Sequence, residues 1–297
     1  MVRVWLIGMG ILSVILVAAF AWPILGARGS GGGPSGPSGM MSGATHASAN
    51  GAPTDSVMGA HPRAVKLTDN EARTPVVVEL FTSEGCSDCP PADAVLEKLD
   101  RTQPVAGAQV IALSEHVDYW NDIGWRDPFS SHAYSERQND YSGHFGLGSV
   151  YTPQMVVDGR IQFVGSSESA AIRAIESAAR AEKIPVTLSG ARFDGGGVTL
   201  RVETGAAPTD AALLVVVEDE SDTSSVSRGE NSGRTLKHVA VVREMSQAAT
   251  IGQGQTFAKE VSVKFARNGG SSYRVVALVQ DPSSGAILGA GSARLSN

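Results

Sequence analysis

Short apolar runs, separated by polar or turn-forming residues, fill most of the chain after its first 75 residues. The run at 76–81, "VVVELF", is rich in β-branched residues and too short for a helix, which indicates a buried strand. The segment at 90–101, "PPADAVLEKLDR", has apolar residues at helical spacing and prolines where the first turn tolerates them. The run at 108–117, "AQVIALSEHV", predicts a second strand. The expected order is therefore strand, helix, strand.

A hairpin and a second helix follow. The segment at 152–166 reads as two short strands joined by a tight turn at Asp158 and Gly159, a dipeptide that favours hairpins. The segment at 167–181, "SESAAIRAIESAARA", has the periodicity of an amphipathic helix. Strands that alternate with helices favour an α/β architecture of packed layers.

The pattern changes at residue 184. Seven short apolar or alternating runs, separated by Gly, Asn, Asp and Ser, lie at 184–189, 197–203, 211–219, 234–244, 256–266, 272–281 and 286–293. Such a series favours a β-sandwich over a barrel. The sequence therefore predicts an α/β domain at 73–183, followed by an all-β, sandwich-like domain at 184–297.

The N-terminal segment differs from both of these regions. Residues 1–27 join Arg3 to an apolar run at 4–25, which fits either a cleaved signal peptide or a membrane anchor, because about 20 apolar residues span a bilayer. Residues 28–72 are rich in Gly, Ser and Pro and predict a flexible linker. Both alternatives imply export. We therefore expect a periplasmic or secreted protein, with residues 4–25 as the candidate membrane tether.

Charge and length add two limits. The net charge of −6 argues against nucleic-acid binding, which usually requires a basic surface. A chain of 297 residues is long enough for about two domains.

The candidate chemistry lies between the first strand and the first helix. The only two cysteines of the chain, Cys86 and Cys89, stand here two residues apart. A thiol at a helix N-terminus is stabilised as the thiolate by the helix dipole, so Cys86 is the candidate nucleophile. Cys89, one turn further on, can resolve a mixed disulfide formed on Cys86. The nearby carboxylates of Glu84 and Asp88 oppose this stabilisation.

Four motifs together resemble a known family. They are "VVVELFTSEGCSDCPPAD", "VIALSEHVDYWNDIGWRDPFSS", "YTPQMVVDGR" and "RGENSGRTLKHVAVVR". They are similar to the secreted thioredoxin-like family catalogued as domain-of-unknown-function family 1223, which carries no established activity. The resemblance implies a thioredoxin-like fold for the first domain, export and a redox role. It also implies a cis bond between Thr152 and Pro153, in a loop that packs over the cysteines, and a buried acid beneath Cys89. With one extra loop residue, Glu79 takes the place of that acid and would transfer protons to or from Cys89.

A polar and aromatic insert at 115–149 separates the second strand from the hairpin. Inserts of this length in compact domains are usually functional, so we expect it to form a substrate groove with Trp120 beside the cysteines. His116 has two interpretations, a base or thiolate-stabilising group and a structural residue. A second polar cluster precedes the strand at 234–244, and it fits either an ion network, which we favour, or a surface that docks on the first domain. Its members are Arg228, Glu230, Asn231, Arg234 and His238.

The leading hypothesis is an exported thiol–disulfide oxidoreductase that exchanges electrons with thiols or disulfides of proteins or small molecules and needs no cofactor. One alternative is a copper-binding or assembly protein that uses both cysteines with His116 or His144, since thiolates suit Cu(I). The other is a non-catalytic binding module whose disulfide only braces a loop, although so short a loop is a poor brace.

Overall fold

The computed structural model describes residues 73–267 and 272–295. The expected signal peptide or anchor and the expected linker therefore lie outside the described residues. No helix within these two ranges is both long enough and apolar enough to cross a bilayer.

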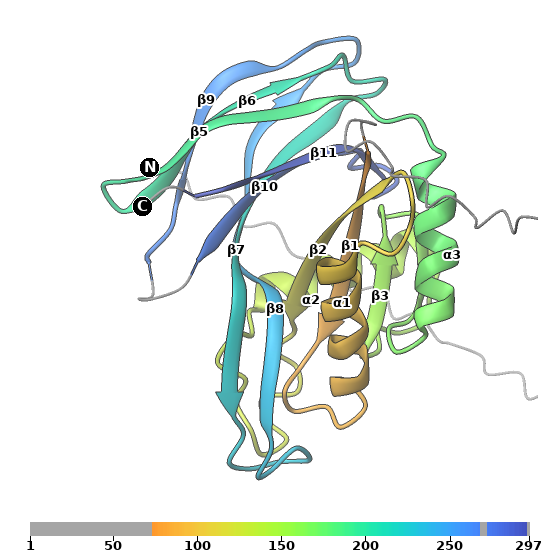
Figure 1. The fold of residues 1–297 in the computed structure, drawn as a ribbon, viewed down its shortest axis with the longest axis vertical. Coiled ribbons are helices and arrows are strands. Elements are labelled where there is room, and N and C mark those ends of the chain that lie inside the picture. Colours follow the sequence, from red (N-terminus) through yellow and green to blue (C-terminus); the bar gives the residue numbers. More distant parts are fainter. Residues whose placement is uncertain (1–72, 268–271, 296–297) are drawn as a thin grey trace, which may run out of the picture. The chain divides into compact units, whose positions relative to one another are not determined.

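Strands from both halves of the chain form one eight-stranded mixed sheet, in the order β11-β10-β7-β8-β2-β1-β3-β4 (Figure 1). These strands are β1 (Thr74–Thr82), β2 (Ala108–His116), β3 (Gln154–Val157), β4 (Ile161–Val164), β7 (Ala211–Ser225), β8 (Thr235–Ile251), β10 (Tyr273–Gln280) and β11 (Ile287–Arg294). β1 and β2 are parallel, whereas β7 and β8 form a long antiparallel hairpin. A parallel bridge between Ser114 of β2 and Val241 of β8 joins the two parts of the sheet.

A second sheet has three strands in the order β5-β6-β9. Its strands are β5 (Val186–Asp194), β6 (Gly197–Thr204) and β9 (Ala258–Lys264). Alternate residues of β6, such as Val198 and Leu200, pack on alternate residues of β7 and β10, such as Val215 and Val275. The period-two alternation of the sequence therefore places one apolar face of each sheet in a shared core.

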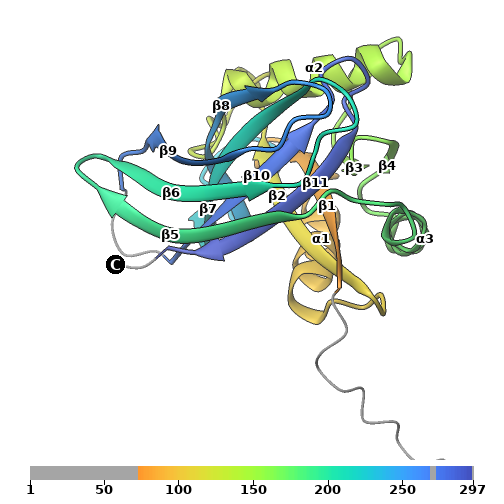
Figure 2. The same ribbon diagram turned by 90° about the horizontal axis from the view of Figure 1, so that it is seen from above.

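Within residues 73–267 and 272–295, three helices cover the large sheet, which Figure 2 shows from above. α1 (Pro90–Thr102) and α3 (Glu168–Ala179) lie on one face, where Leu96 and Ile175 share a core with Leu80 of β1. α2 (His132–Phe145) lies on the other face, where Tyr134 packs with Val77 of β1. Neighbouring residues of β1 point to opposite faces, so the strand contributes to both cores.

The expected fold class is wrong. The structure is not a thioredoxin-like α/β domain followed by a separate β-sandwich, but a mainly β protein in which one mixed sheet contains strands from both sides of residue 184. The sequence pattern located the strands, but it could not show that β8 pairs with β2. That pairing depends on contacts between segments more than a hundred residues apart, and periodicity carries no information on strand partners.

Most individual elements match their predictions, including β1, α1, β2, the β3–β4 hairpin and α3. The exception is α2, which lies inside the polar insert. Its buried positions are all serine, glutamine or tyrosine, namely Tyr134, Ser135, Gln138, Tyr141 and Ser142. A helix with so few aliphatic residues on its buried face gives no clear apolar periodicity, which is why the sequence did not indicate it.

Candidate functional site

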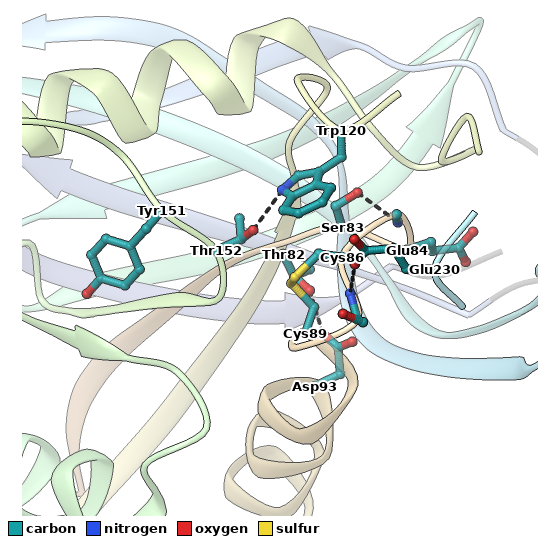
Figure 3. The surroundings of a disulfide bond; sticks show 12 residues. Thr82, Ser83, Glu84, Cys86, Cys89, Asp93, Trp120, Tyr151, Thr152 and Glu230 are labelled. Atoms are coloured by element: carbon teal, nitrogen blue, oxygen red, sulfur yellow. Dashed lines mark hydrogen bonds between the residues drawn. A yellow bond between two sulfur atoms is a disulfide. The ribbon is translucent and has the colours of Figure 1, made fainter. Parts of the chain in front are cut away.

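Cys86 and Cys89 form a disulfide in the loop between β1 and α1, with their Cα atoms 5.4 Å apart (Figure 3). Two successive turns build this loop, because the Cys86 N–H donates to the Ser83 carbonyl and the Cys89 N–H donates to the Cys86 carbonyl. Both cysteines are buried, with exposures of 2% for Cys86 and 0% for Cys89. The first turn of α1 follows directly.

Cys89, and not Cys86, is the capping residue at the N-terminus of helix α1. α1 begins at Pro90, and the carbonyl of the capping residue Cys89 accepts the N–H groups of Ala92 and Asp93. Cys86 lies three residues earlier. The expected placement of Cys86 on the helix end is therefore wrong. The first two residues of α1 are prolines without an N–H group, and the next two N–H groups are bonded to the Cys89 carbonyl, so the first turn offers no free N–H group to either sulfur.

The loop between β7 and β8 holds the cysteine loop from the side. The amide of Asn231 donates to the carbonyls of Glu84 and Cys86, each at 2.9 Å. A carboxylate oxygen of Glu230 accepts the Ser87 N–H at 2.9 Å, and its hydrogen bonds from Ser87 lower the pKa of Glu230. The polar cluster at 228–238 is thus a docking surface for the cysteine loop, which is the alternative that the sequence analysis did not favour.

Replacing Asn231 with alanine is expected to lower the free energy of unfolding by about 1–3 kcal/mol, because a buried double donor is lost. The matched control is Ser232→Ala in the same loop. The Ser232 hydroxyl is exposed and donates only to the Ser227 carbonyl, so this change should cost less than about 0.5 kcal/mol. Urea unfolding of the two variants would measure the difference, and equal losses would contradict the role of Asn231.

Five titratable side chains lie behind the disulfide, close to one another and almost without exposure to solvent. They are Glu84, Asp93, His116, Asp127 and His238. His238 Nε2 is 3.1 Å from Glu84 Oε1, and His116 Nδ1 is 2.7 Å from Asp127 Oδ2. The two imidazole rings meet edge to face, with centroids 4.7 Å apart. We call this group the buried acid–histidine cluster.

The cluster changes the protonation of its members. Burial alone would lower the pKa of His116, but the charge and hydrogen bond of Asp127 and the charges of Asp93 and Glu84 together raise it. Burial opposes ionisation of Asp127, yet His116 and backbone N–H groups lower its pKa overall. Asp93 differs, because burial raises its pKa more than the two histidines and Thr82 lower it. The cluster therefore contains an ion pair between His116 and Asp127, and a carboxyl group, Asp93, whose pKa lies above its ordinary value.

The insert lies beside the disulfide, as expected. Trp120 donates from Nε1 to Thr152 Oγ1 at 2.8 Å, and the bond between Thr152 and Pro153 is cis, which confirms that prediction. A Cβ at Gly85 would lie 3.1 Å from the Trp120 Cβ, so a larger residue before Cys86 would push against the tryptophan. Figure 3 shows Trp120 and Thr152 on the same side of the disulfide.

Glu79 does not lie where the sequence analysis placed it. It accepts hydrogen bonds from Tyr141 OH and from Arg137 Nε, both at 2.6 Å, on the face of the sheet that α2 covers. Cys89 and α1 belong to the opposite face. Strand alternation explains the difference, because Thr82 is the β1 residue that points to α1 and donates to Asp93 Oδ1 at 2.9 Å.

The copper alternative gains no support from the cysteine site. Within the described ranges, no group of three or more His, Cys, Asp or Glu side chains has the geometry to hold a metal ion. His116 is paired with Asp127. His144 lies on α2, beside Gly285.

The sequence did not indicate that Asp93, Asp127 and Glu84 belong to the buried acid–histidine cluster. The spacing Cys89-x-x-x-Asp93 was a usable signal, because residues four apart on a helix share a face. Asp127 and His238 gave no such signal, since they come from an irregular insert and from a distant strand.

The fold and the site define a mixed-sheet, mainly β protein that carries a buried Cys-x-x-Cys disulfide at the start of a helix. The chain belongs to the family described as "Protein of unknown function (DUF1223)", whose model matches residues 77–280. A search of curated proteins found no match.

Two solved structures illustrate the range of similarity. The crystal structure of protein AGR_C_4864 from Agrobacterium tumefaciens has a TM-score of 0.59 and 28% identity, covering 76% of this chain and 96% of that chain. Spo0M, a sporulation control protein from Bacillus subtilis, has a TM-score of 0.23 and 12% identity, covering 38% of this chain and 47% of that chain. The second score is too low to carry an argument.

Proposed function

We propose that this protein is an exported thiol–disulfide oxidoreductase whose working group is the Cys86–Cys89 pair. The observation that carries the proposal is the position of the disulfide, at a helix N-terminus and beside Glu84 and Asp93 of the buried acid–histidine cluster (Figure 3). A disulfide that closes so short a loop removes little entropy from the unfolded chain, so stability alone does not account for it. Titratable groups behind a disulfide suit a reaction that moves protons as well as electrons.

In the proposed exchange, Cys86 is the sulfur that is attacked. A thiolate of a protein or small-molecule thiol attacks Cys86 Sγ, the bond between the two sulfurs breaks, and its electron pair leaves on Cys89 Sγ. A second thiolate then releases the mixed disulfide and leaves a dithiol. Cys86 is the more accessible of the two, and its neighbour Ser87 is exposed. Thr152 and Trp120, on the adjacent side, would contact the incoming thiol.

The proposal includes a location outside the cytosol, periplasmic or secreted. Disulfides persist in oxidising compartments, and the apolar run at 4–25 supports export, either as a signal peptide or as a membrane tether.

A second candidate function is a non-catalytic module in which the disulfide only braces the loop. The burial of both cysteines favours it, because a buried disulfide reacts slowly with external thiols.

The equilibrium reduction potential of the Cys86–Cys89 pair, measured against glutathione, distinguishes the oxidoreductase from the non-catalytic module. We expect a value between about −120 and about −270 mV, the range of thiol oxidoreductases. A value well below about −300 mV would mean a disulfide that resists reduction and would favour the brace. The Cys86→Ser variant, which cannot form the disulfide, is the control for the signal that reports the redox state.

A further inference from the structure

Cys89 has no direct route to solvent. It is 0% exposed, yet the proposed exchange converts it between a disulfide sulfur, a thiolate and a thiol. Each reduction therefore requires that one proton reach a buried sulfur, and each oxidation requires that one proton leave it. An isolated thiolate is costly in such a place, so a proton donor must lie inside the protein.

Asp93 is the titratable group in position for this transfer. It lies one turn after Cys89 on α1, with its N–H bonded to the Cys89 carbonyl at 3.1 Å, and Figure 3 shows its carboxyl group beside Cys89. Thr82 holds one carboxyl oxygen through a hydrogen bond of 2.9 Å. The other oxygen, Oδ2, is 3.9 Å from His238 Nδ1.

His238 continues the path away from the disulfide. Its Nδ1 is buried and, among the described residues, makes no hydrogen bond, whereas its Nε2 is 3.1 Å from Glu84 Oε1. The other oxygen of Glu84 accepts hydrogen bonds from Trp125 Nε1 at 2.7 Å and from Ser224 Oγ at 3.1 Å. Trp125 and Ser224 are both partly exposed, so the path ends at the surface.

We propose that Asp93 donates and accepts the Cys89 proton and that His238 exchanges this proton between Asp93 and Glu84. The inference rests on the proposed thiol–disulfide exchange. The three side chains come from α1, β8 and the loop after β1, so the relay exists only because the β7–β8 hairpin docks on the cysteine loop.

The external thiolate forms a bond to Cys86 Sγ while the Cys86–Cys89 bond breaks, and the electron pair stays on Cys89 Sγ. The Asp93 carboxyl group gives its proton to this sulfur and becomes a carboxylate. A proton then passes from protonated His238 to Asp93, and His238 regains one through Glu84 from solvent. The external thiol is oxidised and the disulfide is reduced.

The surroundings fit this role for Asp93. The groups that face it are Thr82 of β1, His238 of β8 and, further away, His116 and Asp127. Burial raises the pKa of its carboxyl group above the ordinary value, which favours the protonated form that a proton donor needs. The 3.9 Å gap to His238 Nδ1 requires only a small side-chain movement to become a hydrogen bond.

The test is the rate of reduction by dithiothreitol between pH 5 and 9, expressed per dithiothreitol thiolate. In the wild-type protein this rate should fall as the pH rises through the pKa of Asp93, because the ionised carboxylate has no proton to give. Asp93→Asn keeps the shape and the Thr82 contact but cannot donate an acidic proton. It should react about tenfold or more slowly at low pH and lose that pH dependence. Glu97→Gln, on the exposed side of the same helix, should leave the reduction rate and its pH dependence unchanged.

The outcomes are separable. Asp93→Asn with the wild-type rate and pH profile would overturn the relay but leave the exchange function standing. A wild-type disulfide that dithiothreitol does not reduce at any pH would overturn both. His238→Gln retains a donor to Glu84 but cannot relay a proton, so a wild-type rate in this variant would remove His238 from the path.

Discussion

Replacing Arg137 with methionine is expected to lower the free energy of unfolding by about 3–5 kcal/mol, the usual cost of removing one partner from a buried ion pair. Arg137 lies over two carboxyl groups that are both 0% exposed, Glu79 and Glu115. Its Nη1 also donates to Gln280 at 3.0 Å and its Nη2 to Tyr141 at 3.0 Å. Methionine fills most of the volume but leaves Glu79 buried without a cation.

The loss should depend on pH, which distinguishes lost charge from lost packing. Burial and the neighbouring Glu79 already raise the pKa of Glu115 well above its ordinary value, so the folded protein keeps that proton. Without Arg137, Glu79 would also have to stay protonated in the folded state. The unfolded chain releases both protons above about pH 4.5, so the folded state then binds more protons and stability falls as pH rises. We therefore expect Arg137→Met to lose less free energy of unfolding, relative to the wild-type protein, at pH 4 than at pH 7.

A surface ion pair supplies the matched control. Arg101 pairs with Glu97 on α1 at 2.7 Å, but the Arg101 side chain is 70% exposed. Arg101→Met should cost less than about 1 kcal/mol at any pH. Urea unfolding at the two pH values would measure both variants. A deficit in Arg137→Met that does not change with pH would mean that packing, and not charge, accounts for its effect.

The ion network around Arg137 also shows what the sequence could and could not predict. Side chains alternate along a strand, so the sequence of β1 is enough to place Glu79 on the same face as Val77 and Phe81. The sequence did not show that α2 covers this face, because α2 buries polar and tyrosine side chains. The expectation that Glu79 lies beneath Cys89 came from the family resemblance and not from the strand pattern. Local alternation thus gave the direction of the side chain, but not the element that it meets.

The same limit applies to the sheet and to the cysteine site. The seven apolar runs after residue 184 correspond to β5 to β11, since periodicity records which residues are buried. The polar end of β7, at 220–225, was not predicted, although the end of β8 with which it pairs lies within the predicted run at 234–244. This pairing runs from Ser221 with Val239 to Ser225 with Thr235. That polar extension carries His238 and Asn231 to the disulfide. Half of the candidate site therefore depends on a strand pairing that leaves no local pattern.

Replacing Gly159 with alanine is expected to be the second most damaging single change, at about 2–5 kcal/mol, from backbone strain and overpacking together. Val157 pairs with Ile161, so residues 158–160 connect β3 and β4. Asp158 and Gly159 of this turn have φ values of 51° and 62°, in the left-handed region that favours glycine. A Cβ on Gly159 would also overlap the carbonyl oxygen of Gly285 and lie 2.8 Å from its carbonyl carbon. Both neighbours are backbone atoms, so no side-chain rotation can relieve the clash.

The turn cannot move away from Gly285, because Asp158 fixes it on three sides. Its Oδ1 accepts the Val77 N–H at 2.9 Å, its Oδ2 accepts Lys183 Nζ at 2.6 Å, and its carbonyl accepts the Ile287 N–H at 2.9 Å. Gly107 provides the control, with a φ of 76° and nothing within 4 Å of an added Cβ. Gly107→Ala should therefore show only the conformational cost of about 1–2 kcal/mol. The difference between the two variants in free energy of unfolding, measured with urea, gives the cost of the clash. Equal losses would show that the turn and Gly285 can move apart to accommodate the added Cβ.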